Sequence, residues 1–74
     1  MTKLPVVSGD ECIRALQKVG YRVARTRGSH AWLVCPARAP VPVPKHHELG
    51  RGILRKILHT ADIRVEEFVE LLEK

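Results

Sequence analysis

Apolar residues recur at helical spacing in two long stretches of the chain and in one short stretch near its end. The first predicted helix begins after Ser8 and ends before Gly20, because glycine commonly follows the last turn of a helix. The second predicted helix covers residues 50–61 and the third covers residues 65–72. The apolar face of the first helix consists of Cys12, Ile13, Leu16 and Val19.

The two later helices each have one apolar face, which we expect to be buried. In the second helix this face is Ile53, Leu54, Ile57, Leu58 and Ala61. In the third helix it is Val65, Phe68, Val69 and Leu72, with the glutamates pointing outward.

The start of the first helix has the sequence of a capping box. The Ser8 hydroxyl can accept a hydrogen bond from the Glu11 amide, and the Glu11 carboxylate can reach back to the Ser8 amide. This pattern fixes where the first helix begins.

Residues 21–26 and 31–35 alternate in polarity and read as strands, and residues 41–44 read as a third strand. Pro42 and Pro44 cannot donate to a ladder, so the third strand belongs at a sheet edge. The order is helix, three antiparallel strands, helix and short helix. We expect one α+β domain spanning residues 1–74, with the helices packed on one face of the sheet. Double-stranded-RNA-binding domains have the same α-β-β-β-α order.

The first two strands are joined by Gly28 and Ser29, and glycine at the first central position suits a type II′ turn. In that register the residues of the two strands pair directly and share one sheet face. The predicted pairs are Arg27 with His30, Arg25 with Trp32, and Val23 with Val34. The opposite face carries Ala24, Thr26, Ala31 and Leu33.

Charge is unevenly distributed in this chain of 74 residues and net charge +5. Residues 1–61 hold 11 Lys/Arg and 3 Asp/Glu, or +8, whereas residues 62–74 hold 2 and 5, or −3. A basic body suits a polyanion partner and is equally compatible with simple solubility. No apolar run approaches the roughly 18 residues of a membrane span, and no signal-peptide core is visible, so we expect a cytoplasmic location.

Several residue patterns bear on chemistry by their absence. Cys12 and Cys35 have no metal-ligand spacing and are expected to be free thiols, with no metal site. The basic body has no carboxylate pair, and the chain has no P-loop and no dinucleotide fingerprint. These patterns argue against hydrolases that need two acids and against nucleotide-driven enzymes.

His30 is the sharpest candidate for chemistry, because an imidazole exchanges protons near neutral pH. Arg25 and Arg27 beside it can hold a phosphate and offset charge that develops during phosphoryl transfer. The alternative is a polar residue at a strand end that bonds the turn backbone. Trp32 is either a stacking platform for a base or a core residue.

Further candidates follow the third strand. His46 and His47 are adjacent, so their side chains diverge, and one of them can supply a second acid or a phosphate contact. The alternative is a solvated connector. On the second helix Arg51, Arg55 and Lys56 form either a phosphate-tracking face or an ordinary wet face.

Several short motifs follow one another along the chain. They are Leu4-Pro5-Val6-Val7-Ser8-Gly9, Gly20-Tyr21, Arg27-Gly28-Ser29-His30, Val41-Pro42-Val43-Pro44 with a following histidine, Gly52-Ile53-Leu54-Arg55-Lys56-Ile57-Leu58 and Val65-Glu66-Glu67-Phe68. In this order and spacing the motifs resemble the HicA toxin family, also called YcfA-like mRNA interferases. The resemblance spans nearly the whole chain.

This resemblance implies a double-stranded-RNA-binding-like fold and a metal-independent ribonuclease that cleaves mRNA. It also implies a HicB-type antitoxin partner that covers the active face. The family's catalytic histidine, in Gly-Ser-His, corresponds to His30. The chain departs from the commoner pattern at Ala31-Trp32, at Val34-Cys35 and at Pro42.

The expected protein is therefore the toxin of a type II toxin–antitoxin pair, an endoribonuclease without cofactor. His30 acts as general base on an RNA 2′-hydroxyl and a 2′,3′-cyclic phosphate results. The expected RNA contacts are Arg25, Arg27, Gly28, Ser29, Trp32, Lys45, His46, Arg51 and Arg55. The alternatives are a non-catalytic RNA-binding module and a protein-interaction domain with an acidic partner.

Overall fold

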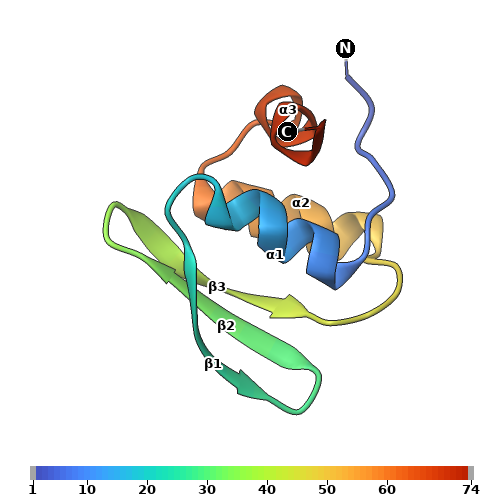
Figure 1. Cartoon of the computed structure of the whole chain (residues 1–74). Helices are drawn as coiled ribbons and strands as arrows, with labels where there is room; N and C mark the ends of the chain where they lie inside the picture. The colour runs from blue at the N-terminus through green and yellow to red at the C-terminus, as the bar shows by residue number, and fades with distance from the viewer. Residues whose placement is uncertain (1, 74) are drawn as a thin grey trace.

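The computed structural model describes residues 2–73, so both ends of the predicted domain, Met1 and Lys74, lie outside the described residues. The order is α1 (Gly9–Gln17), β1 (Arg22–Arg27), β2 (His30–Cys35), β3 (Arg38–Pro44), α2 (Arg51–Ala61) and α3 (Val65–Glu73) (Figure 1). The strands form one antiparallel sheet in the order β1-β2-β3. The predicted α+β fold with α-β-β-β-α order and a short C-terminal helix is confirmed.

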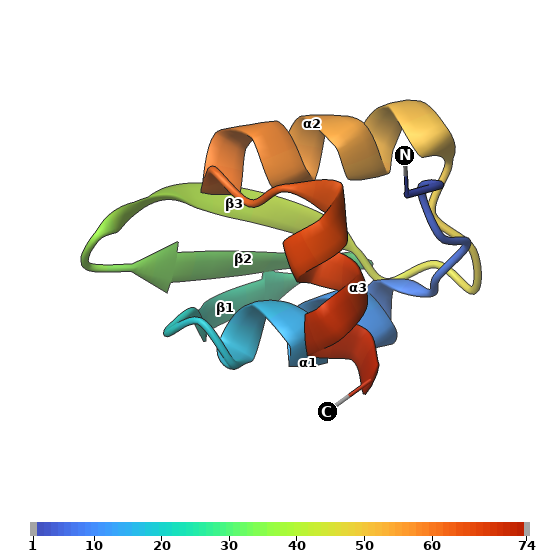
Figure 2. The same ribbon diagram turned by 90° about the horizontal axis from the view of Figure 1, so that it is seen from above.

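The helices form a second layer over one face of the sheet. α3 runs across α1 and α2 on the side away from the strands (Figure 1 and Figure 2). Buried apolar side chains from both layers meet between them. The largest fully buried side chains are Phe68, Leu16, Leu33, Leu54, Val41, Val43 and Cys12.

The first turn of α1 is anchored by a capping box and by a close backbone contact. The Ser8 amide donates to Glu11 Oε1 at 2.8 Å, and the Glu11 amide donates to Ser8 Oγ at 3.1 Å, as predicted. The Gly9 amide donates to the His46 carbonyl at 2.9 Å. A Cβ at Gly9 would overlap the Pro44 carbonyl and lie 2.8 Å from Lys45 Cα, so only glycine allows α1 to approach β3 this closely.

The β1–β2 hairpin follows the predicted register near its turn and departs from it further along. Gly28, the first central residue of the turn, has φ +60°. Ser29, the second, does not have a positive φ, because among the described non-glycine residues only Asp62 has one. A positive φ at the first central position alone fits a type II′ turn. Arg27 pairs with His30 and Arg25 with Trp32.

The predicted pairing of Val23 with Val34 is wrong. A bulge between Val23 and Arg25 inserts Ala24, so Val23 faces Leu33 and Arg22 faces Val34. An extra residue in one strand moves each side chain beyond the bulge to the opposite face of the sheet. Arg22 therefore takes the position on the His30 face that the sequence had assigned to Val23.

β3 is an edge strand, as its prolines predicted, but it begins at Arg38 rather than at Val41. Pro42 lies opposite Trp32 and Pro44 opposite His30. Proline has no N–H, so these are the non-hydrogen-bonded positions and their carbonyls point away from β2. The Lys45 amide donates to the Ser29 carbonyl at 2.6 Å. The alternation of hydrogen-bonded and non-hydrogen-bonded pairs therefore continues one residue past the end of β3.

The predicted apolar face of α2 is correct at four of its five positions. Leu54, Ile57, Leu58 and Ala61 are buried, but Ile53 is 43% exposed, so its predicted burial is wrong. At 100° per residue Ile53 lies at the margin of the buried stripe, beyond the reach of the sheet.

The two cysteines are free, as predicted. Cys12 is buried in α1, and this burial raises the pKa of its thiol to about 12, whereas Cys35 is half-buried. Cys12 therefore serves as a small apolar core residue.

We expect Gly9→Ala to lower the free energy of unfolding by about 1–3 kcal/mol, because the added methyl group would overlap backbone atoms that cannot rotate away. Gly52→Ala is the matched control. A Cβ at Gly52 meets nothing within 4 Å, so Gly52→Ala should raise the free energy of unfolding by up to about 1 kcal/mol. Denaturant unfolding measures both, and equal effects of the two substitutions would contradict the close approach.

The capping box should make stability depend on pH. The hydrogen bonds from the Ser8 amide, and then the Ser8 hydroxyl, lower the pKa of Glu11 in the folded chain. The charged carboxylate therefore stabilises the fold above its unfolded pKa of about 4.3, and this contribution is lost as pH falls through the lower folded pKa. Glu11→Gln should be less stable than wild type at pH 7, with the difference vanishing in acid. A difference that stays constant from pH 7 to pH 2.5 in urea titrations would exclude the charge effect.

Candidate functional site

The sheet face opposite the helices gathers the predicted site residues of the hairpin. His30 and Trp32 are exposed, whereas Ala31 and Leu33 between and after them are buried. Side chains of directly paired residues lie on the same face at short range. Arg27 therefore neighbours His30, and Arg25 neighbours Trp32.

Trp32 is 38% exposed, so it belongs to this open face and not to the core. It lies in a row across the three strands, between Arg25 of β1 and Pro42 of β3. A flat aromatic ring between a guanidinium and a proline ring is a surface on which a nucleobase can stack.

Arg22 is a member of this face that sequence reasoning missed. The bulge at Ala24 brings it to the same side as His30 and Trp32, so the outer strand presents three arginines, Arg22, Arg25 and Arg27. All three are exposed. Bulges leave little trace in a short polar strand, so no sequence signal could have found it.

His46 lies beside His30. Their ring centroids are 6.5 Å apart and their planes are inclined by 72°. Two backbone hydrogen bonds hold the connector that carries His46: the Lys45 amide to the Ser29 carbonyl, and the Gly9 amide to the His46 carbonyl. The second imidazole is thus positioned by both the hairpin turn and the start of α1.

A groove of about 270 Å³ adjoins His30, between β3 and α2. Its walls are mostly apolar, with three polar side chains. The lining residues are His30, Val41, Pro42, Pro44, Ile53, Lys56, Ile57 and Thr60. Sequence reasoning missed this groove because helical periodicity assigned Ile53 to the core.

The remaining predicted contacts are distributed around these features. Gly28, Ser29 and Lys45 are exposed at the turn and beside it. Arg51 and Arg55 are exposed on α2 but do not line the groove, because helical spacing puts them on the flank opposite Lys56. His47 is exposed in the connector.

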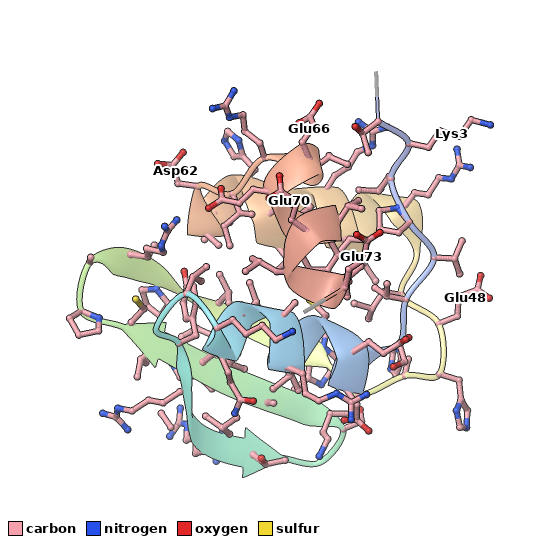
Figure 3. The ribbon with its side chains drawn as sticks, turned by 45° about the horizontal axis from the view of Figure 1, so that its top comes forward. Lys3, Glu48, Asp62, Glu66, Glu70 and Glu73 are labelled. Atoms are coloured by element: carbon pink, nitrogen blue, oxygen red, sulfur yellow. The ribbon has the colours of Figure 1, made fainter. Side chains whose placement is uncertain are left out.

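The acidic side chains of the C-terminal stretch lie away from the hairpin. Figure 3 shows Asp62, Glu66, Glu70 and Glu73 around α3 and the helical layer, away from the β1–β2 hairpin. The acidic end of the sequence is therefore separated in space from the arginines of β1. This separation favours approach of a polyanion to the sheet face.

Within residues 2–73, no three His, Cys, Asp or Glu side chains gather closely enough to hold a metal ion. None of the helices in this range combines the length and apolar character of a membrane span.

Trp32→Thr should lower the free energy of unfolding by less than about 1 kcal/mol, because the ring is partly exposed and threonine suits a strand. Leu33→Ala, one position along on the buried face, should cost about 2–5 kcal/mol. Chemical denaturation compares the two. A larger loss at Trp32 than at Leu33 would mean that the faces are reversed.

Comparison with known proteins agrees with these features. A search of curated proteins finds no significant match. A family model described as the HicA toxin of bacterial toxin–antitoxin systems matches residues 9–63, which contain the hairpin, both histidines and all the groove residues. The match covers well over half of the chain and confirms the resemblance seen in its motifs. The chain belongs to the HicA toxin family.

Proposed function

We propose that this toxin is a metal-independent endoribonuclease that cleaves mRNA, with His30 as general base. The observation that carries the proposal is the neighbouring pair of imidazoles, His30 and His46, with ring centroids 6.5 Å apart on an exposed, arginine-rich surface. Two imidazoles this close together can both reach the same phosphate group. One can accept a proton while the other donates one.

In the proposed reaction neutral His30 takes the proton of an RNA 2′-hydroxyl. The 2′-oxygen attacks the adjacent phosphorus and forms the O2′–P bond as the P–O5′ bond breaks. Protonated His46 gives its proton to the leaving 5′-oxygen. The products are a 2′,3′-cyclic phosphate and a 5′-hydroxyl, and the nucleophile comes from the substrate.

The charge that builds on the phosphate during attack needs fixed cations nearby. Arg27 lies directly opposite His30 in the ladder, and Arg25 is two residues further along the same strand. Lys45 is tied through its amide to Ser29, next to His30. We assign these three side chains to the phosphate, and Gly28, Ser29 and Trp32 to the nucleotides beside it.

Arg51 and Arg55 are assigned to RNA binding away from the cleaved phosphate. They are exposed on α2, on the flank away from the groove, where they can bind only phosphates distant from the cleaved one. Their loss should weaken RNA binding and make it less dependent on salt, with little effect on the chemical step.

A toxin of this family has an antitoxin partner. We propose that a HicB-type antitoxin inhibits the enzyme by covering the sheet face, and that both act in the cytoplasm, where mRNA is found. The runner-up function is an RNA-binding module that uses the same face without cutting, and the paired histidines favour the enzyme over it. The third candidate function is a protein-interaction domain whose basic face binds an acidic partner.

His30→Ala should lower the rate of RNA cleavage by at least about 100-fold, because a general base contributes about 10²–10⁴ to a rate. His46→Ala should do the same. The test is incubation of the purified chain with a defined single-stranded RNA in EDTA, with identification of the cyclic-phosphate ends. An RNA with 2′-deoxyribose at the cleaved nucleotide should stay intact.

His47→Ala is the matched control, because His47 follows His46 directly and is exposed, yet has no place in the proposed reaction. It should cleave at the wild-type rate. Cleavage that survives His30→Ala would refute the assignment. RNA binding without any cleavage by the wild-type chain would favour the binding module.

A further inference from the structure

Ile53 is the most exposed large apolar side chain on the described helices, and it lines the groove beside His30. Pro42 and Pro44 form the facing wall from β3, and Ile57 lies at the base of the helical wall. An apolar surface left open to water beside a reaction site is typical of a binding surface for an apolar part of a ligand.

We propose that this groove is a nucleobase subsite that takes the base of a nucleotide next to the cleaved phosphate. The inference rests on the proposed function in one respect, since it takes His30 as the position of the reacting phosphate. It goes further by assigning a bound group to residues that have no part in the chemistry.

The groove is continuous with the open sheet face. Pro42 lies opposite Trp32 and Pro44 opposite His30 in the ladder, so the side chains that flank His30 lead directly into the groove. An RNA strand that puts a phosphate at His30 therefore brings a neighbouring base to the groove entrance.

The size and chemistry of the groove suit a single base. Its volume of about 270 Å³ lies just below the roughly 300–1,000 Å³ of sites for larger ligands. Pro42 and Ile53 offer exposed apolar contacts, while the Thr60 hydroxyl can bond a base edge and the Lys56 ammonium can bind the adjoining phosphate. Bases of single-stranded RNA are free to turn out of the stack into such sites.

The test is a coupling measurement with an RNA that cannot be cleaved. An oligonucleotide with 2′-O-methyl groups throughout is prepared intact and as a series with one abasic nucleotide at each position. Its affinity for the wild-type chain and for Ile53→Ser is measured by titration. Val6→Ser is the matched control, because Val6 is another exposed aliphatic residue, remote from the groove in sequence and absent from its lining.

Ile53→Ser should weaken binding of the intact RNA about tenfold, in the range of a lost base contact. One RNA of the abasic series, the one that lacks the base bound in the groove, should bind the wild-type chain more weakly by a similar factor. Ile53→Ser should not weaken the binding of that RNA any further. Val6→Ser should bind as wild type. Thr60→Phe, which fills the groove from α2, should reproduce the effect of Ile53→Ser.

The subsite would be refuted if Ile53→Ser weakened the binding of the intact RNA and of every abasic RNA by the same factor. It would also be refuted if Ile53→Ser and Thr60→Phe both bound the intact RNA with wild-type affinity. Unchanged RNA affinity with a lost affinity for the antitoxin would assign the groove to that protein instead. Cleavage of ordinary RNA by the wild-type chain is measured in parallel. Cleavage without coupling refutes only the subsite, whereas coupling without cleavage refutes only the enzymatic function.

Discussion

The arrangement of the candidate site depends on the contact between the first residue of α1 and the end of β3. Gly9 lets the helix start approach the Pro44–Lys45 backbone to a distance that no side chain would permit, and its amide bonds the His46 carbonyl. One residue earlier in the connector, the Lys45 amide bonds the Ser29 carbonyl of the hairpin turn. The segment between these two bonds carries His46 to His30, so the packing of α1 on the sheet and the pairing of the two imidazoles are one structural feature.

The prolines of β3 have two consequences that reinforce each other. Without N–H groups, Pro42 and Pro44 occupy the non-hydrogen-bonded positions opposite Trp32 and His30, which fixes the register of β3 on β2. Their outer edge has no donors with which another strand can pair, so it is protected from edge-to-edge association. The same edge is left free to form an apolar wall facing α2. A residue type that limits aggregation thereby also shapes the groove.

The sequence was sufficient for the elements whose pattern is local. The capping box of α1, the Gly28–Ser29 turn, the pairs next to that turn and the edge position of β3 all follow from short-range rules, and all are present. Val23 was misplaced because a bulge changes the register without changing polarity, and Arg22 was missed for the same reason. Ile53 was misplaced because helical periodicity gives the direction of a side chain but not the extent of the sheet beneath it. The neighbourhood of His46 and His30 depends on how a connector folds back on the hairpin, which no periodic pattern encodes.

α3 lies outside the matched part of the family model, yet it is integral to the fold. Phe68 is completely buried, and the Lys18 ammonium donates to the Leu71 carbonyl at 2.6 Å, which ties the end of α1 to the last turn of α3. Because α3 lies on the far side of the helical layer, Glu66, Glu70 and Glu73 lie away from the β1–β2 hairpin (Figure 3). Opposite charges near the hairpin would compete with phosphate for the arginines. The position of α3 therefore completes the core while leaving the basic face available to a polyanion.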